Sequence, residues 1–304
     1  DSLMRRYHLP LLIPLLLLSL GANAAPRVVV TILPVHSLVA AVMEGVGEPR
    51  LLLPAGASPH SYALLPSDAQ ALTEADLIVW VGPDLEPFLQ KSLRTLARRA
   101  ATMQLTALPD LTLLGTDPQH VHAGHEGGDH RHDPHLWLDP VNAMAIVEAV
   151  QAQLAALDPA NTDVYRANAE RQQQRLHALD RELQAATAPL QGMRFLVFHD
   201  AYRYFTERYG LASIGALTLS PDRLPGARTV AAARDRIRRG QVRCVFREPQ
   251  FEPSIAEAIV RGTGARVGTL DPIGADLPPG PEAYGQLLRN LANSLHACLA
   301  PGRD

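Results

Sequence analysis

Three histidines stand singly at points where a predicted strand or loop gives way to the next element. His60 follows a short apolar run within Leu-Pro-Ala-Gly-Ala-Ser-Pro-His-Ser-Tyr, His135 opens His-Leu-Trp-Leu-Asp-Pro, and His199 ends Phe-Leu-Val-Phe-His. Asp271 ends a fourth run, within Thr-Leu-Asp-Pro. Because ligands of open parallel sheets sit at the carboxyl ends of the strands, we expect these four side chains to converge on one point.

The donor set of these four residues indicates a particular metal. Three imidazoles and one carboxylate suit four-coordinate Zn²⁺, whereas Mg²⁺, Ca²⁺ and Mn²⁺ prefer shells rich in oxygen. Any one of the histidines, taken alone, fits a structural role equally well, and their common position is what indicates a site. The sequence therefore predicts that His60, His135, His199 and Asp271 bind Zn²⁺.

A second group of histidines lies in the segment 115–133, which has no apolar periodicity and is rich in Gly, His and Asp. We expect a mobile loop with weak additional metal sites, because ordering a loop on binding costs conformational entropy. The alternatives are a solvated loop without metal, or a storage role centred on the loop. The expected ligands are His120, His122, His125, His130 and His132, with Asp129 and Asp133.

The surrounding elements alternate between strands and helices, which predicts an α/β fold with parallel sheets flanked by helices. We expect an N-terminal lobe over 25–140, linking helices over 141–190 and a C-terminal lobe over 191–304, with the metal site in the cleft. A helix over 159–188 would join the lobes. The predicted strands are 27–33, 51–53, 77–81, 103–105, 194–198, 212–217, 242–246 and 266–269. The other predicted helices are 37–46, 64–75, 87–100, 140–157, 201–209, 229–239, 254–263 and 282–299.

The first residues have the order of a secretory signal peptide: two arginines, an apolar run over 9–20, and Ala-Asn-Ala at 22–24. The run is shorter than the ~20 residues of a membrane span and contains two prolines, and no cysteine follows for lipidation. We therefore predict cleavage after residue 24 and a periplasmic protein without a membrane anchor.

Two cysteines, Cys244 and Cys298, lie in the last quarter of the chain. In an oxidising compartment an even pair predicts one disulfide, which here would join a strand to the last helix. Two separate buried thiols are the alternative.

Composition and motifs argue against a nucleic-acid-binding protein and against an enzyme. The 304 residues carry a net charge of −3 and are 47% hydrophobic, with no basic stripe that would favour nucleic acid. A zinc hydrolase remains an alternative, but the sequence holds neither His-Glu-x-x-His nor a nucleophile elbow. We therefore predict a binding protein rather than an enzyme.

Several segments in order resemble one known family, the cluster A-I (cluster 9) metal-binding proteins of bacterial ABC importers, and within it the zinc-uptake branch. The matching segments are Ile-Leu-Pro-Val-His-Ser-Leu-Val near 32–39, Gly-Ala-Ser-Pro-His at 56–60, His-Leu-Trp-Leu-Asp-Pro at 135–140, Phe-His-Asp-Ala-Tyr at 198–202, Glu-Pro-Gln-Phe at 248–251 and Leu-Asp-Pro-Ile-Gly at 270–274.

The resemblance implies a two-lobed protein that delivers Zn²⁺ to an ABC permease in the inner membrane, and we expect a monomer. It implies metal ligands at His60, His135 and His199, the last being a glutamate in manganese members, so that a manganese or iron binder is the alternative. Asp271 matches a residue that is a ligand in some members only. Zinc members resemble this chain in carrying a His-rich loop.

The remaining polar residues receive other interpretations. We expect structural roles for three histidines, His36, His177 and His296. Asp200 is a candidate hydrogen-bond acceptor for a ligating imidazole. Glu248 and Glu252 are candidate surface contacts with the membrane partner.

Overall fold

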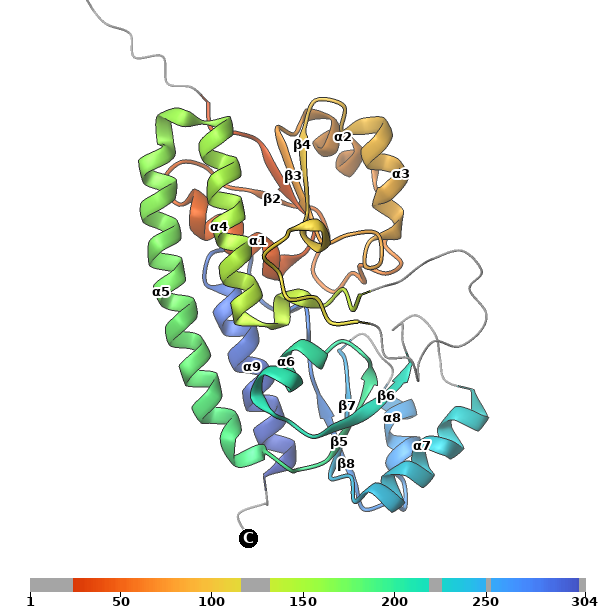
Figure 1. Ribbon diagram of the computed structural model, residues 1–304. Helices are drawn as coiled ribbons and strands as arrows, with labels where there is room; N and C mark the ends of the chain where they lie inside the picture. Colours follow the sequence, from red (N-terminus) through yellow and green to blue (C-terminus); the bar gives the residue numbers. More distant parts are fainter. Residues whose placement is uncertain (1–23, 116–131, 219–225, 250–252, 301–304) are drawn as a thin grey trace, which may run out of the picture.

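The computed structural model describes residues 24–115, 132–218, 226–249 and 253–300, and it contains two parallel four-stranded sheets with helices around them (Figure 1). The strand orders are β2-β1-β3-β4 and β6-β5-β7-β8, so both sheets have the same topology. Every strand pair in both sheets is parallel. The predicted fold class is confirmed. The signal-peptide prediction falls on 1–23, outside the described residues.

The N-terminal sheet has a fully buried centre, because β1 and β3 consist of apolar, mostly β-branched residues. Its strands are β1 Val28–Val30, β2 Arg50–Leu51, β3 Leu77–Trp80 and β4 Ala101–Gln104. Its helices are α1 Leu33–Met43, α2 Pro66–Glu74 and α3 Pro87–Leu96. Helix α1 begins at Leu33, whereas the sequence predicted a start at residue 37. Pro34 lies in the first turn, where a helix loses nothing by the missing N–H.

The C-terminal sheet is built in the same way around the buried strand β5, which lies between β6 and β7. Its strands are β5 Phe195–His199, β6 Ser213–Thr218, β7 Cys244–Arg247 and β8 Arg266–Thr269. Its helices are α6 Arg203–Tyr209, α7 Ala227–Gly240, α8 Pro253–Val260 and α9 Ala283–Leu299.

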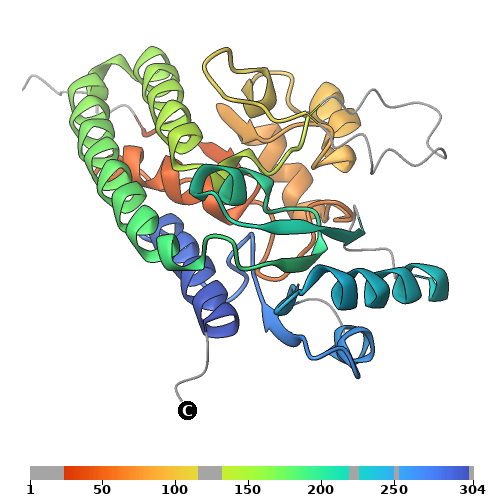
Figure 2. The ribbon, with the colours of Figure 1, turned by 60° about the horizontal axis from the view of Figure 1, so that its bottom comes forward.

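Two long helices, α4 Pro140–Leu157 and α5 Thr162–Thr187, run side by side next to the N-terminal lobe, and α5 continues along the C-terminal lobe (Figures 1 and 2). At 26 residues, α5 is about 39 Å long and spans both lobes. Helix α4 has the length and mean hydropathy of a membrane span, yet it packs on α5 and α1 and buries seven of its residues. We therefore interpret α4 as a helix of the protein core.

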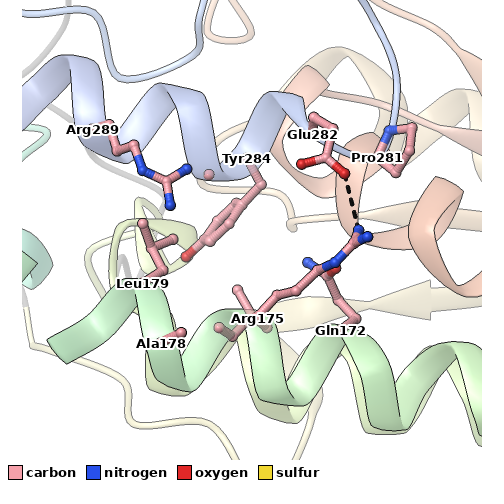
Figure 3. A pocket seen from close by; sticks show the side chains of 10 residues that line it. Gln172, Arg175, Ala178, Leu179, Pro281, Glu282, Tyr284 and Arg289 are labelled. Carbon is pink, nitrogen blue, oxygen red and sulfur yellow. Dashed lines mark hydrogen bonds and ion pairs between the residues drawn. The ribbon is translucent and has the colours of Figure 1, made fainter. Parts of the chain in front are cut away.

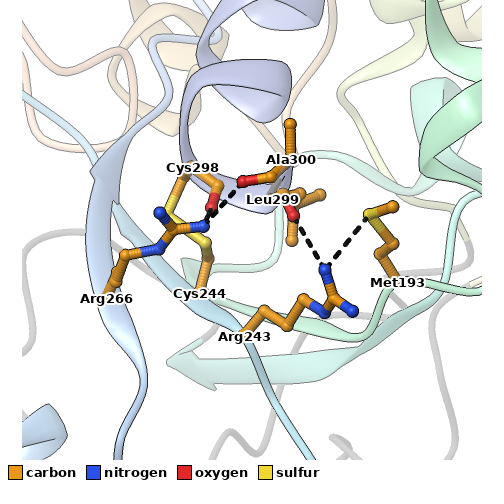
Figure 4. Close-up of a disulfide and its surroundings, with 7 residues drawn as sticks. All are labelled: Met193, Arg243, Cys244, Arg266, Cys298, Leu299 and Ala300. Carbon is orange, nitrogen blue, oxygen red and sulfur yellow. Dashed lines mark hydrogen bonds between the residues drawn. A yellow bond between two sulfur atoms is a disulfide. The ribbon is translucent and has the colours of Figure 1, made fainter. Parts of the chain in front are cut away.

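The last helix, α9, ties the two lobes together. It begins beside α1, where the Tyr284 amide donates to the Ser37 hydroxyl (2.9 Å). At its other end the predicted disulfide between Cys244 and Cys298 is present and joins α9 to β7 (Figure 4). Arg266 donates to the Cys298 and Ala300 carbonyls, which closes the end of the helix. One hydrophobic core therefore extends through α1, α4, α5 and α9 into both sheets.

Helices α5 and α9 also border a cavity of about 240 Å³ (Figure 3). An ion pair between Arg175 and Glu282 crosses it (2.9 Å). None of the three single histidines lines this cavity. The cavity therefore belongs to the packing interface between α5 and α9.

Glu86 is a fully buried carboxyl group at the carboxyl edge of the N-terminal sheet, and it gives a testable pH dependence of stability. Burial raises the pKa of Glu86 to about 7, against the opposing effect of hydrogen bonds from the Val81 and Gly82 amides. The folded protein thus holds a proton that the unfolded chain releases near pH 4.5. The free energy of unfolding should therefore fall as pH rises from about 4.5 to about 7.

We expect Glu86→Gln to remove this decline. In urea unfolding of the metal-free protein, the variant should gain up to about 3 kcal/mol over wild type at pH 8 and little at pH 4.5. Glu148→Gln, at an exposed position of α4, is the matched control. A constant difference between Glu86→Gln and wild type across this range would contradict the expectation.

Candidate metal centre

The structure brings His60, His135 and His199 together. One nitrogen of each ring lies within 4.8 Å of the others. The ring centroids are 5.6 Å apart for His60 and His135, 5.2 Å for His60 and His199, and 4.9 Å for His135 and His199. Sequence reasoning placed these residues at the ends of separate elements, and the tertiary structure joins them in one cluster.

Each histidine reaches the cluster from a different element. His199 is the last residue of β5, the buried strand in the middle of the C-terminal sheet. His135 precedes the 3-10 turn Leu136–Leu138 that leads into α4. His60 lies between β2 and α2, where its amide donates to the Ser58 hydroxyl (3.3 Å). The cluster therefore combines the N-terminal segment, the start of the linking helices and the C-terminal sheet.

Two of the rings are held by carboxylates. His135 Nδ1 lies 2.8 Å from Asp133 Oδ1, which also accepts from the His135 amide (3.0 Å). His199 Nδ1 lies 2.8 Å from Glu248 Oε1. The remaining nitrogen of His199, Nε2, is buried and makes no hydrogen bond, and the same holds for His60 Nε2. These buried unpaired nitrogens are the atoms that a metal ion would engage.

The structure corrects two sequence interpretations. Glu248 is 1% exposed and accepts from His199, so its assignment as a surface contact is wrong. Glu248 lies directly after β7, at the carboxyl end of a strand, as His199 does at the end of β5. The rule that polar residues at strand ends are candidate site residues could therefore have found Glu248 as well. Asp133, assigned to the His-rich loop, is buried and bonded to His135. The charge of Asp200 raises the pKa of His199, and its role as a hydrogen-bond acceptor for a ligating imidazole stays a prediction.

Electrostatics differ between the rings. Burial lowers the pKa of His60 well below its ordinary value, and the neighbouring His199 and His135 lower it further. Burial alone would lower the pKa of His199 as well, but Glu248, with Asp200 and Asp133, raises it. His60 is therefore neutral at physiological pH, which is the form that ligates metal.

Asp271 is not part of the cluster of three. One carboxylate oxygen accepts from the Ile273 and Gly274 amides (3.0 and 2.8 Å), and the other accepts from the Ala275 amide (2.6 Å). In this conformation the side chain stabilises the turn after β8. Its role as a fourth ligand stays a prediction.

The other histidines are distributed away from the cluster. His36 is buried in α1 with Nε2 2.9 Å from the Pro49 carbonyl, which fits the expected structural role, whereas His177 is exposed on α5 and His296 on α9. His132 forms an isolated bridge with Gly115. The other expected loop ligands, His120, His122, His125, Asp129 and His130, lie outside the described residues, and so does Glu252, a candidate surface contact.

Trp137 closes one side of the cluster. Its ring centroid is 5.3 Å from that of His135, and its indole N–H donates to the Pro272 carbonyl (2.8 Å). Tyr284 of α9 donates to the Trp137 carbonyl (2.8 Å). The wall of the site is thus tied to both the turn after β8 and the last helix.

Two α/β lobes that share a long helix, with imidazoles from both gathered at one point, define a two-lobed metal-binding protein. The model of the family "Zinc-uptake complex component A periplasmic", ZnuA, matches residues 28–298, and the chain belongs to this family. The family is one of periplasmic solute-binding proteins, which implies a binding role rather than catalysis.

Individual relatives agree with this membership. The chain is 40% identical to the high-affinity zinc uptake system protein ZnuA of Brucella suis biovar 1, over 92% of this chain and 93% of the relative. A crystal structure of ZnuA superposes with a TM-score of 0.78 at 27% identity, covering 91% of this chain and all of the other. A ZnuA deletion mutant solved with zinc bound has a TM-score of 0.76 at 26% identity, covering 91% and 99%.

Proposed function

We propose that this protein binds Zn²⁺ in the periplasm through His60, His135 and His199 and delivers it to the permease of an ABC importer. The observation that carries the proposal is the cluster of three imidazole nitrogens within 4.8 Å, contributed by both lobes. The name of the Brucella relative and the zinc-bound ZnuA deletion mutant support it. Zn²⁺ is the cargo of the protein, and no chemical step is required of the site.

The geometry suits zinc after a small contraction. Two nitrogens at Zn–N distances of ~2.05 Å and a tetrahedral angle are about 3.3 Å apart. The three nitrogens lie within 4.8 Å, so side-chain rotation or slight closure of the lobes would bring them onto one ion. The fourth position would be filled by Asp271, after it leaves its turn, or by water. Opening of the lobes would separate ligands of different elements and release the ion to the permease.

The nitrogen donors also favour zinc over the alternative cargo of this fold. Mn²⁺ prefers oxygen-rich shells, and the cluster of described residues offers three nitrogens and no carboxylate oxygen. A hydrolase is disfavoured because the family is one of solute-binding proteins. We infer that residues 1–24 are removed on export and that the mature chain acts as a monomer.

Metal analysis tests this function. The purified mature protein should hold one tightly bound Zn²⁺ per chain in elemental analysis, and excess Mn²⁺ should fail to displace it in a competition titration. A variant lacking residues 117–131 separates the site from the His-rich segment, whose histidines we propose as weaker additional ligands. It should keep the tight site and lose only weak binding. Displacement of zinc by Mn²⁺, or loss of the tight site with the segment, would overturn the proposal.

A further inference from the structure

A buried carboxylate stands behind an imidazole on each side of the cluster. Asp133, 5% exposed, lies in the segment that leads into α4, and Glu248, 1% exposed, follows β7 of the C-terminal sheet. Each lies 2.8 Å from the Nδ1 atom of one histidine. Among the described residues, His60 has no such carboxylate partner.

These contacts fix which nitrogen faces the metal. A carboxylate can only accept, so Nδ1 of His135 and of His199 must carry the hydrogen of each bond. The lone pair of each neutral ring then lies on Nε2, and His199 Nε2 is the buried nitrogen without a partner. Tyr202 holds Glu248 in place through a longer contact (3.4 Å) while it donates to the Leu270 carbonyl (3.1 Å).

The same contacts determine the charge around a bound ion. Three neutral imidazoles bring no charge of their own, and the site is buried, where Coulomb interactions are weakly screened. Asp133 and Glu248 supply negative charge behind two of the ligands, and the charge of Asp200 adds to the negative potential at His199. Since Coulomb energy is proportional to the charge of the ion, a divalent ion gains twice as much from each carboxylate as a monovalent ion at the same place.

We propose that Glu248 and Asp133, one on each side of the site, orient His199 and His135 and, through their negative charge, make the site selective for divalent over monovalent cations. The inference rests on the proposed function and extends it to the basis of charge selectivity. Both residues are positioning residues that act on the ion through an imidazole. The two carboxylates would disfavour soft monovalent ions that bind imidazole, relative to Zn²⁺.

Glu248→Gln tests the charge separately from the hydrogen bond, because the glutamine carbonyl still accepts from His199 Nδ1. Competition titrations with Zn²⁺ and, in chloride-free buffer, with Ag⁺ measure the two affinities. Zn²⁺ affinity should fall by about 10- to 100-fold, the range typical of lost outer partners. Ag⁺ affinity should fall by only about the square root of that factor, roughly 3- to 10-fold, because its charge is half as large.

Two further variants make the result unambiguous. Asp133→Asn removes the charge on the other side and should lower the Zn²⁺-to-Ag⁺ ratio in the same direction. Glu182→Gln, in an exposed ion pair with Arg289, should leave both affinities at the wild-type value. Equal losses for the two ions, or unchanged Zn²⁺ affinity in Glu248→Gln and Asp133→Asn, would overturn the inference. Wild-type protein that binds no Zn²⁺ would instead overturn the proposed function.

Discussion

Replacing His199 with alanine should remove the tight zinc site. The ring is 2% exposed, its Nε2 has no other partner, and it is the ligand that the C-terminal sheet contributes. Loss of an outer partner typically weakens metal binding by ~10- to 100-fold, and loss of a ligand should cost more than that. We therefore expect the zinc affinity to fall by more than about 100-fold in calorimetric titration at neutral pH.

The control for this substitution is His177→Ala, at an exposed position of α5. It should bind one Zn²⁺ with unchanged affinity. The circular dichroism spectrum of metal-free His199→Ala should match wild type, so that lost binding is distinguished from lost folding. A folded His199→Ala protein that still binds one Zn²⁺ with wild-type affinity would remove His199 from the ligand set.

The second large effect is expected from loss of the disulfide. Cys244 and Cys298 are 54 residues apart in sequence, and the chain-entropy relation for a loop of this length gives about 4 kcal/mol of stabilisation. The double substitution of both cysteines by alanine should lower the free energy of unfolding by about that amount in urea titrations of the metal-free protein. The melting temperature should fall with it.

This effect should be confined to stability. The bond joins β7 to the end of α9, and neither cysteine belongs to the histidine cluster. Zinc affinity of the folded double variant should therefore match wild type. Reduction of the wild-type protein should reproduce the loss of stability, and an unfolding midpoint insensitive to both treatments would show that the bond adds nothing to the fold.

The order of helices and strands was predictable from the sequence, because the elements are marked by local features. Apolar β-branched runs gave the strands, and α4, Pro140–Leu157, has the predicted bounds. The start of α1 differs from the predicted residue 37 because proline, which ends a strand pattern in the sequence, also fits the first turn of a helix, where Pro34 lies. The strand-end rule placed His199 because it depends only on where a strand stops.

The sequence by itself determined which elements and residues are present: alternating strands and helices, two cysteines that can form a disulfide, and three histidines suited to zinc. The tertiary structure decided which residues are in contact, because packing brings together segments that are far apart in the sequence and that no local sequence pattern links. Glu248 lies 49 residues from His199 in sequence, and only the pairing of β5 with β7 brings its carboxylate to the ring. Asp271 satisfies a turn instead of joining the cluster because three backbone amides converge on its carboxylate.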